Sequence, residues 1–269
     1  MKYLSVLLLV WSINLSAEPL KIVALAPHIT EMLFAIGAGD EVVAVSDYSD
    51  YPEAAVSIPR VANFASINIE AVLALQPDVV IGWQSGNPPE DLKRLKQFGI
   101  NVVMSDPLTL ADIAKELRML GELTHHQVQA EQQALQFEQQ LSAMQQQYKA
   151  AKSIKVFFAM GTTPLSTVAN KAWPQQILTL CGADNPFAEV KGDYPQVGIE
   201  QVVDSQPDVI IQAAGGNIKP DFSYWRKFSA IPAVKQQQYL AVNADFLYRT
   251  TPRTLLGIQQ VCHGLDAFR

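Results

Sequence analysis

Two stretches of the chain share one pattern of hydrophobic and polar residues. Residues 67–87 read INIEAVLALQPDVVIGWQSGN, and residues 197–217 read VGIEQVVDSQPDVIIQAAGGN. The two stretches align without a gap, and both contain an Ile-Glu pair, a Gln-Pro-Asp triplet and a Gly-Asn pair at matching places. The two copies stand 130 residues apart (200 − 70), a period too long for a solenoid, so they predict two related lobes.

Each copy of the repeat predicts the same local structure. A short amphipathic helix, IEAVLAL or IEQVVDS, is stopped by Gln-Pro-Asp, because proline cannot continue a helix. The apolar, β-branched runs that follow, DVVIG and DVIIQ, are typical of strands buried in a parallel sheet. A glycine-rich turn then follows each strand at its carboxyl end, where open α/β sheets bind ligands. The sequence therefore predicts two half-sites that face each other across a cleft.

The rest of the chain continues the alternation of strands and helices. Strands are expected at 21–27, 41–46 and 154–160, the first followed by a helix that Thr30 could cap, and residues 244–250 are expected to form a loop. Alternation of this kind predicts an α/β fold with two Rossmann-like lobes and mainly parallel sheets. We expect an N-terminal lobe at 18–106, one long helical strut at 107–151 and a C-terminal lobe at 152–269. Such a strut predicts small lobe motion.

The beginning of the chain predicts export. Residues 1–17, MKYLSVLLLVWSINLSA, combine one Lys, an apolar run and small residues before a cleavage point after Ala17, as in a secretory signal peptide. The run is shorter than the roughly 20 apolar residues that span a membrane. A net charge of −6 without basic clusters argues against nucleic acid as a partner. We therefore expect a periplasmic protein.

The chain has two cysteines, Cys181 and Cys262. In an exported protein an even number favours a disulfide, which would tie the last helix to the helix containing Cys181. Two buried free thiols are the alternative, and a metal site formed by two distant cysteines is a weaker one.

Aromatic residues gather in the loops expected after strands. They include Tyr48, Phe64, Trp83, Tyr194, Phe246 and Tyr248. Each alone could belong to a core, but together they indicate the walls of a broad apolar cleft. Asp245 and Arg249, four residues apart, could offer an acceptor and a donor to one ligand or form an ordinary local pair.

Other polar residues leave alternatives open. No GxSxG, HExxH, P-loop or GxGxxG motif is present, so an enzyme is disfavoured. His28 stands where the first strand meets its helix, and it suits a hydrogen-bonding role better than metal ligation. Glu70 and Glu200 stand at matching places in the two copies of the repeat. Either the helix dipole stabilises each carboxylate in the first turn of its helix, or the two carboxylates form a docking surface for a dimeric partner.

Several stretches resemble one known family. SDYSDYP (46–52), INIEAVLALQPDVVIGW (67–83), YPQVGIEQV (194–202) and DFLYRTTPR (245–253) are similar to segments of the substrate-binding proteins that serve ABC importers of cobalamin, haem and siderophores. The resemblance covers the whole mature chain and is strongest to the cobalamin-binding members. It implies that the protein carries cobalamin as a ligand, without a resident cofactor, to a dimeric permease with its ATPase, and that it is a monomer when free.

The resemblance also implies roles for individual residues. Positions expected to contact the corrinoid are Tyr48, Phe64, Trp83, Tyr194 and the segment Asp245, Phe246, Leu247, Tyr248 and Arg249. Glu70 and Glu200 match carboxylates that pair with arginines on the two permease subunits, and Cys181 and Cys262 match a disulfide. His28 departs from the family pattern. Haem or an iron–siderophore is therefore the alternative ligand, with His28 or Tyr48 on the iron.

Overall fold

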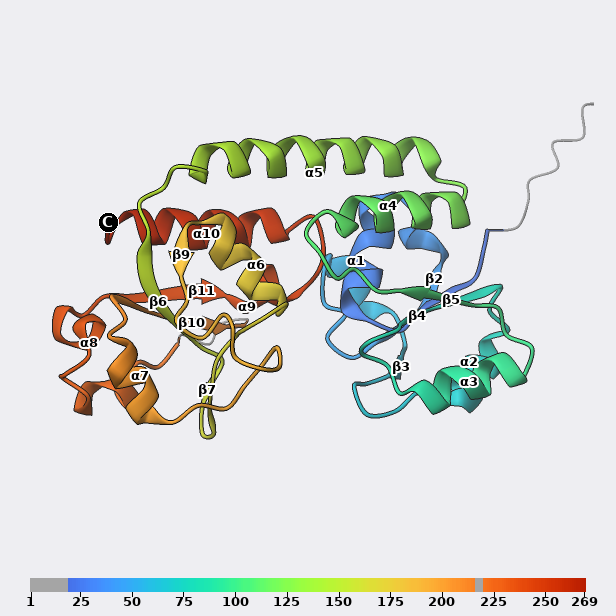
Figure 1. The fold of residues 1–269 in the computed structure, drawn as a ribbon. Helices are drawn as coiled ribbons and strands as arrows, with labels where there is room; N and C mark the ends of the chain where they lie inside the picture. Colours follow the sequence, from blue (N-terminus) through green and yellow to red (C-terminus); the bar gives the residue numbers. More distant parts are fainter. Residues whose placement is uncertain (1–18, 216–219) are drawn as a thin grey trace, which may run out of the picture.

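The computed structural model describes residues 19–215 and 220–269, and Figure 1 shows their arrangement as two lobes beneath a long helix. The predicted signal peptide, and Gly216 and Asn217 of the repeat, lie outside the described residues. The expected fold class, two α/β lobes with mainly parallel sheets, is confirmed.

The N-lobe, from β1 to α4, is built on a parallel sheet. Its strands, in the order β3-β2-β1-β4-β5, are Arg60–Ala62, Val42–Ser46, Ile22–Ala24, Val79–Trp83 and Val102–Ser105. Side chains alternate between the two faces of a strand, so Ile22 and Val23 enter different cores. Helices α1 (Pro27–Ala35) and α4 (Asp112–Leu123) cover one face, and α2 (Ile69–Leu75) and α3 (Pro89–Gln97) cover the other.

The C-lobe, from β6 to α10, repeats this plan. Its parallel sheet has the order β11-β10-β6-β9, with strands Tyr239–Asn243, Val209–Ala214, Ile154–Ala159 and Ala183–Asp184. Helices α6 (Trp173–Leu180) and α10 (Thr254–Asp266) pack on one face, and α7 (Ile199–Ser205) and α8 (Pro232–Gln236) on the other. The remaining elements are the antiparallel pair β7 (Gly161–Thr162) and β8 (Leu165–Ser166), helix α9 (Ala244–Tyr248), and the 3-10 helices η1 (Gly39–Glu41), η2 (Glu53–Ser57) and η3 (Ser223–Lys227).

The two copies of the repeat adopt matching backbones. Gln76 and Gln206 end α2 and α7 in the left-handed region, with φ of 49° and 47°. Asp78 accepts a hydrogen bond from the backbone N–H of Lys21 at 2.8 Å, just before β1. Asp208 accepts one from Lys155, in β6, at 3.2 Å. The Gln-Pro-Asp triplet therefore ends each helix and links the following strand to the first strand of its lobe.

The helical strut predicted at 107–151 contains two helices, α4 and α5 (Gln127–Tyr148), rather than one continuous helix. After α4 the chain reverses through His125, which has φ of 60°, and α5 runs back along α4 and over the C-lobe (Figure 1). The two helices approach closely at Gly121, where a Cβ would lie 2.2 Å from the Cβ of Ala130. The turn at His125 contains neither Gly nor Pro, so the sequence gives no local signal for it. Side chains from both lobes and from α5, including Phe137, form one continuous core.

Two local predictions need correction. Helix α1 begins at Pro27, so Thr30 lies inside it and bonds the Ala26 carbonyl oxygen instead of capping the helix. Proline suits the first helical position because its missing N–H would have no partner there. The expected loop 244–250 contains α9, because the Asn243 side chain caps it by accepting a hydrogen bond from Asp245 N at 2.8 Å.

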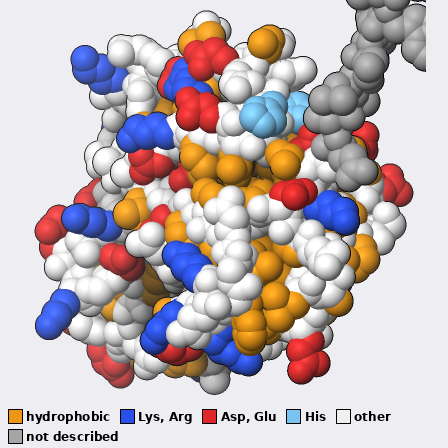
Figure 2. Space-filling view, turned by 90° about the vertical axis from the view of Figure 1, so that its right-hand side faces the viewer, with side chains coloured by type: hydrophobic (Ala, Val, Ile, Leu, Met, Phe, Trp, Pro, Cys, Tyr) orange, Lys and Arg blue, Asp and Glu red, His pale blue; other side chains and the backbone are white. Residues whose placement is uncertain are grey.

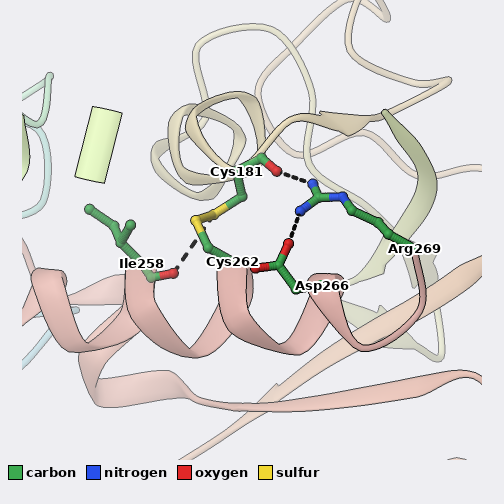
Figure 3. The surroundings of a disulfide bond; sticks show 5 residues. All are labelled: Cys181, Ile258, Cys262, Asp266 and Arg269. Atoms are coloured by element: carbon green, nitrogen blue, oxygen red, sulfur yellow. Dashed lines mark hydrogen bonds and ion pairs between the residues drawn. A yellow bond between two sulfur atoms is a disulfide. The ribbon is translucent and has the colours of Figure 1, made fainter. Parts of the chain in front are cut away.

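The disulfide prediction is confirmed. Cys181, at the end of α6, is bonded to Cys262 in α10, with their Cα atoms 4.8 Å apart (Figure 3). Arg269 donates hydrogen bonds both to the carbonyl oxygen of Cys181 and to the Asp266 carboxylate, so the chain end is held at the same place. The alternatives of free thiols and of a metal site formed by these cysteines are therefore wrong.

The outer end of the N-lobe has a mixed surface. Figure 2 shows Lys and Arg side chains interspersed with Asp and Glu around orange hydrophobic areas on this face. Across residues 19–215 and 220–269, no helix is both long and apolar enough to cross a membrane.

Candidate functional site: an aromatic cleft rim bridged by an arginine

Three predicted site residues of the N-lobe line one pocket. Tyr48 follows β2, Phe64 follows β3 and Trp83 ends β4, so all three come from the carboxyl ends of strands in one parallel sheet. They surround a cavity of about 200 Å³ whose other walls include Leu25 and Gly86. Tyr48 is 71% exposed and Phe64 87% exposed. Large aromatic side chains left this open beside a cavity are typical of a binding surface.

Trp83 is held in place from behind. A Cβ at Gly86 would lie 1.9 Å from the Trp83 ring, so only glycine allows the indole to lie there. The Asn87 side chain accepts a hydrogen bond from Trp83 N at 2.7 Å and donates one to the Leu25 carbonyl oxygen at 2.9 Å. The ring of His28 meets the Trp83 indole edge-on, with centroids 5.2 Å apart. The pocket wall therefore rests on a buried polar support.

His28 is part of that support rather than of the pocket lining. Its side chain is 4% exposed, and its Nε2 lies 3.4 Å from the Ser105 hydroxyl. Burial lowers the pKa of His28 to about 3, because an imidazolium would lose its hydration there. A neutral histidine behind Trp83 agrees with the hydrogen-bonding role predicted for it.

One predicted C-lobe aromatic, Tyr248, lies against the carboxyl end of β6. Tyr248, at the end of α9, donates a hydrogen bond to the Met160 sulfur at 3.2 Å and packs edge-on against Phe158. Tyr194 is 54% exposed. Burial, and then the nearby Tyr194, raise the pKa of the Tyr248 phenol above its usual value. The Tyr248 phenol is therefore neutral and can donate its hydrogen bond to Met160.

Arg249 joins the two lobes at this rim. Its Nη1 donates to Asp50 Oδ1 at 2.6 Å, and its Nη2 lies 3.0 Å from Asp245 Oδ1. Asp245 and Arg249 thus form the local ion pair that was the alternative to ligand contact, and their contact with a ligand stays a prediction. Sequence reasoning missed Asp50 as a partner, although it lies in the stretch SDYSDYP that was singled out. We call Asp50, Asp245 and Arg249 the rim triad.

Leu247, predicted to contact the ligand, does not present its side chain to the rim. This side chain is fully buried in the core shared by both lobes. Because α9 is helical, Leu247 points away from the face that presents Asp245 and Arg249. Phe246 is half-buried, and its ring lies 5.4 Å from the Arg253 guanidinium carbon.

A second cross-lobe contact lies behind the rim triad. Glu31, in α1, is 3% exposed and receives hydrogen bonds from Arg253 Nε at 2.7 Å and Arg253 Nη2 at 2.6 Å. The Thr251 hydroxyl donates to the same carboxylate at 2.6 Å. The Arg253 guanidinium also lies 3.6 Å above the Tyr51 ring. No sequence signal pairs Glu31 with Arg253, because the two stand 222 residues apart.

Glu70 and Glu200 occupy equivalent places in the two lobes. Each stands in the first turn of its helix, α2 or α7, and each is exposed. Figure 1 shows α2 and α7 in different lobes, both on the side of the molecule opposite α5. Among the described residues, no group of three or more His, Cys, Asp or Glu could hold a metal ion.

Comparison with known proteins decides the family. Residues 22–244 match the family model described as "Periplasmic binding protein". The chain belongs to this family. A vitamin B12-binding protein of Vibrio cholerae is 41% identical, with 93% of this chain and 91% of that protein covered. One from Vibrio parahaemolyticus is 36% identical, with 96% and 94% covered.

Solved structures agree with this assignment. The crystal structure of the periplasmic vitamin B12-binding protein BtuF of Vibrio cholerae is similar with a TM-score of 0.84 at 39% identity, and the match covers 93% of this chain and 98% of that one. The expected resemblance to cobalamin-binding members of the family is therefore confirmed. A haem-binding protein, RhuT from Roseiflexus, has a TM-score of 0.82 at 24% identity, with 93% and 100% covered, and shares the fold.

Proposed function

We propose that this protein binds cobalamin without catalysing a reaction, and that it does so in the periplasm as the substrate-binding protein of an ABC importer. The observation that carries the proposal is the aromatic pocket of Tyr48, Phe64 and Trp83 beside the rim triad. Relatives more than 35% identical over more than nine-tenths of the chain are vitamin B12-binding proteins, which supports the same ligand.

The corrinoid would lie between the lobes. Exposed aromatic faces, Tyr48 and Phe64 on one side and Tyr194 and Tyr248 on the other, would cover its apolar ring. The rim triad would meet its polar periphery. The cobalt is already coordinated within this ligand, so the protein has to supply shape, apolar contact and hydrogen bonds.

Large closure of the lobes is not part of the proposal. One hydrophobic core runs through both lobes and α5, and the buried Glu31–Arg253 pair links them as well. Opening the lobes would expose this core to water. We therefore expect the radius of gyration from X-ray scattering to change little when ligand binds, and a wide closure would contradict this part of the proposal.

Calorimetry with cyanocobalamin and with haem tests the ligand. We expect one-to-one binding of cyanocobalamin with a dissociation constant below about 1 μM, and weaker or absent haem binding. Haem binding without a cobalamin signal would overturn the proposal in favour of the alternative ligand. His28→Ala and Tyr48→Phe would then identify the iron ligand, and the burial of His28 makes Tyr48 the stronger candidate.

Glu70 and Glu200 are proposed to dock the two subunits of a permease. Their exposure, and their equivalent positions in two similar lobes, suit a partner with twofold symmetry. The double change Glu70→Arg and Glu200→Arg should leave cobalamin affinity unchanged and stop uptake in cells. Glu122→Arg, an exposed charge reversal on α4, is the matched control. Normal uptake by the double variant would contradict docking, and stabilisation by the helix dipole would then explain the two carboxylates.

A further inference from the structure

The rim triad carries more negative than positive charge. Arg249 is the cation shared by two carboxylates, Asp50 from the N-lobe and Asp245 from the C-lobe. The nearby Arg253 is bound to Glu31, which offsets its charge. Another carboxylate, that of Asp47, lies among the residues around the aromatic pocket. A ligand that reaches this rim therefore meets hydrogen-bond acceptors in a net negative field.

Asp50 is placed to meet a ligand as well as Arg249. It stands two residues after Tyr48, which lines the aromatic pocket, and half of its side-chain surface is exposed. Partial burial tends to raise the pKa of Asp50, but the hydrogen bond and charge of Arg249 outweigh this and hold it below its usual value. The Asp50 carboxylate is therefore ionised at neutral pH and accepts hydrogen bonds without donating any.

The two tetrapyrrole ligands differ in what they present at their edges. Cobalamin carries uncharged amide side chains, whose NH₂ groups donate and whose carbonyl oxygens accept. Haem carries ionised carboxylates. An amide can donate to Asp50 or Asp245 while Arg249 donates to its carbonyl oxygen. A carboxylate in the same place would be repelled by two like charges and would compete with them for one arginine.

We propose that Asp50 is a further ligand-contacting residue that makes the rim selective for amide-bearing over carboxylate-bearing tetrapyrroles. This inference rests on the proposed cobalamin-binding function and deepens it. Selectivity arises from repulsion of the wrong ligand as much as from attraction of the right one. Asp50 and Asp245 come from opposite lobes but bind the same guanidinium, so one peripheral group of the ligand can meet both carboxylates.

Asp50→Asn tests this role with little change in shape. The probes are cyanocobalamin, its derivative in which one peripheral amide is hydrolysed to a carboxylate, and haem, each titrated into the mature protein by calorimetry. Wild-type protein should prefer cyanocobalamin to the monocarboxylate. In the variant, cyanocobalamin should bind severalfold more weakly and the carboxylate ligands more tightly. The ratio of the dissociation constants of the monocarboxylate and cyanocobalamin should therefore fall by about tenfold, which corresponds to about 1.4 kcal/mol.

Asp40→Asn is the matched control, because it removes the same charge from an exposed position elsewhere in the N-lobe. An unchanged preference in Asp50→Asn, or equal weakening of all ligands, would overturn the inference while the proposed function stands. Absence of cyanocobalamin binding by the wild-type protein would overturn the proposed function itself. If Asp40→Asn lowered the ratio of the two dissociation constants by the same factor, the net charge of the protein would explain the selectivity. That result would also overturn the role of Asp50.

Discussion

Removing Arg253 should destabilise the protein strongly, because it leaves a buried carboxylate without its cation. Glu31 is 3% exposed, and Arg253 donates two of the three hydrogen bonds that its carboxylate receives. In Arg253→Met only the Thr251 hydroxyl would remain as a donor. Breaking a buried pair in this way costs about 3–5 kcal/mol, since the remaining charge has lost its water as well as its partner.

Urea unfolding followed by circular dichroism measures this effect. With a denaturant slope of about 3 kcal/mol per molar urea, the midpoint should fall by roughly 1 M or more. Arg118→Met is the matched control, because Arg118 also bonds two carboxylates, Glu131 and Glu138, but all three side chains lie at the surface. The control should change the midpoint little, because water already solvates these groups.

A second variant separates loss of packing from loss of charge balance. Adding Glu31→Gln to Arg253→Met removes the stranded charge but keeps an acceptor for Thr251, so the double variant should recover much of the lost stability. Unfolding of Arg253→Met at the same urea concentration as Arg118→Met would show that the buried pair does not stabilise the protein. Additive destabilisation by the two changes would lead to the same conclusion, because Glu31 and Arg253 would then not be coupled.

Three further predictions concern the support of Trp83 and the disulfide. The pKa of His28 is lowered to about 3, so the unfolded chain takes up a proton below pH 6.5 while the folded protein does not. The free energy of unfolding should therefore be highest above pH 6.5 and fall by about 2 kcal/mol by pH 5. Urea unfolding at several pH values should show that His28→Phe lacks this part of the pH dependence. The same pH dependence in both proteins would contradict the burial of a neutral His28. Gly86→Ala should displace the Trp83 ring, because the added Cβ would lie 1.9 Å from it. Calorimetry should then show cobalamin binding weakened at least tenfold. Unchanged affinity would mean that Trp83 is not part of the proposed pocket wall. Replacing Cys181 and Cys262 by Ser should lower the unfolding free energy by roughly 4 kcal/mol, because the bond closes a loop with a sequence separation of 81, and a loss below about 1 kcal/mol would show that the α6–α10 contact holds without it.

Much of the site could be located from the sequence because its residues follow short, local patterns. Trp83 is the last residue of an apolar run that forms a strand, so its place at the carboxyl end of β4 follows from the strand itself. Asp245 and Arg249 meet because a spacing of four residues brings side chains together on one helical turn. Leu247 shows the limit, since its position in α9 makes it core while its neighbours in sequence reach the rim.

Backbone preferences act over a few residues, and they alone determined the helix, the Gln-Pro-Asp stop and the strand in each copy of the repeat. The chain has two cysteines, so the sequence allowed one intramolecular pairing, and the structure shows that this bond is formed. Only the tertiary structure decided that the chain reverses at His125, where α4 and α5 meet at Gly121. It also decided that Arg249 reaches Asp50 and that Arg253 reaches Glu31. Those contacts join opposite lobes, and their partners depend on how the shared core docks the lobes, which no local pattern encodes.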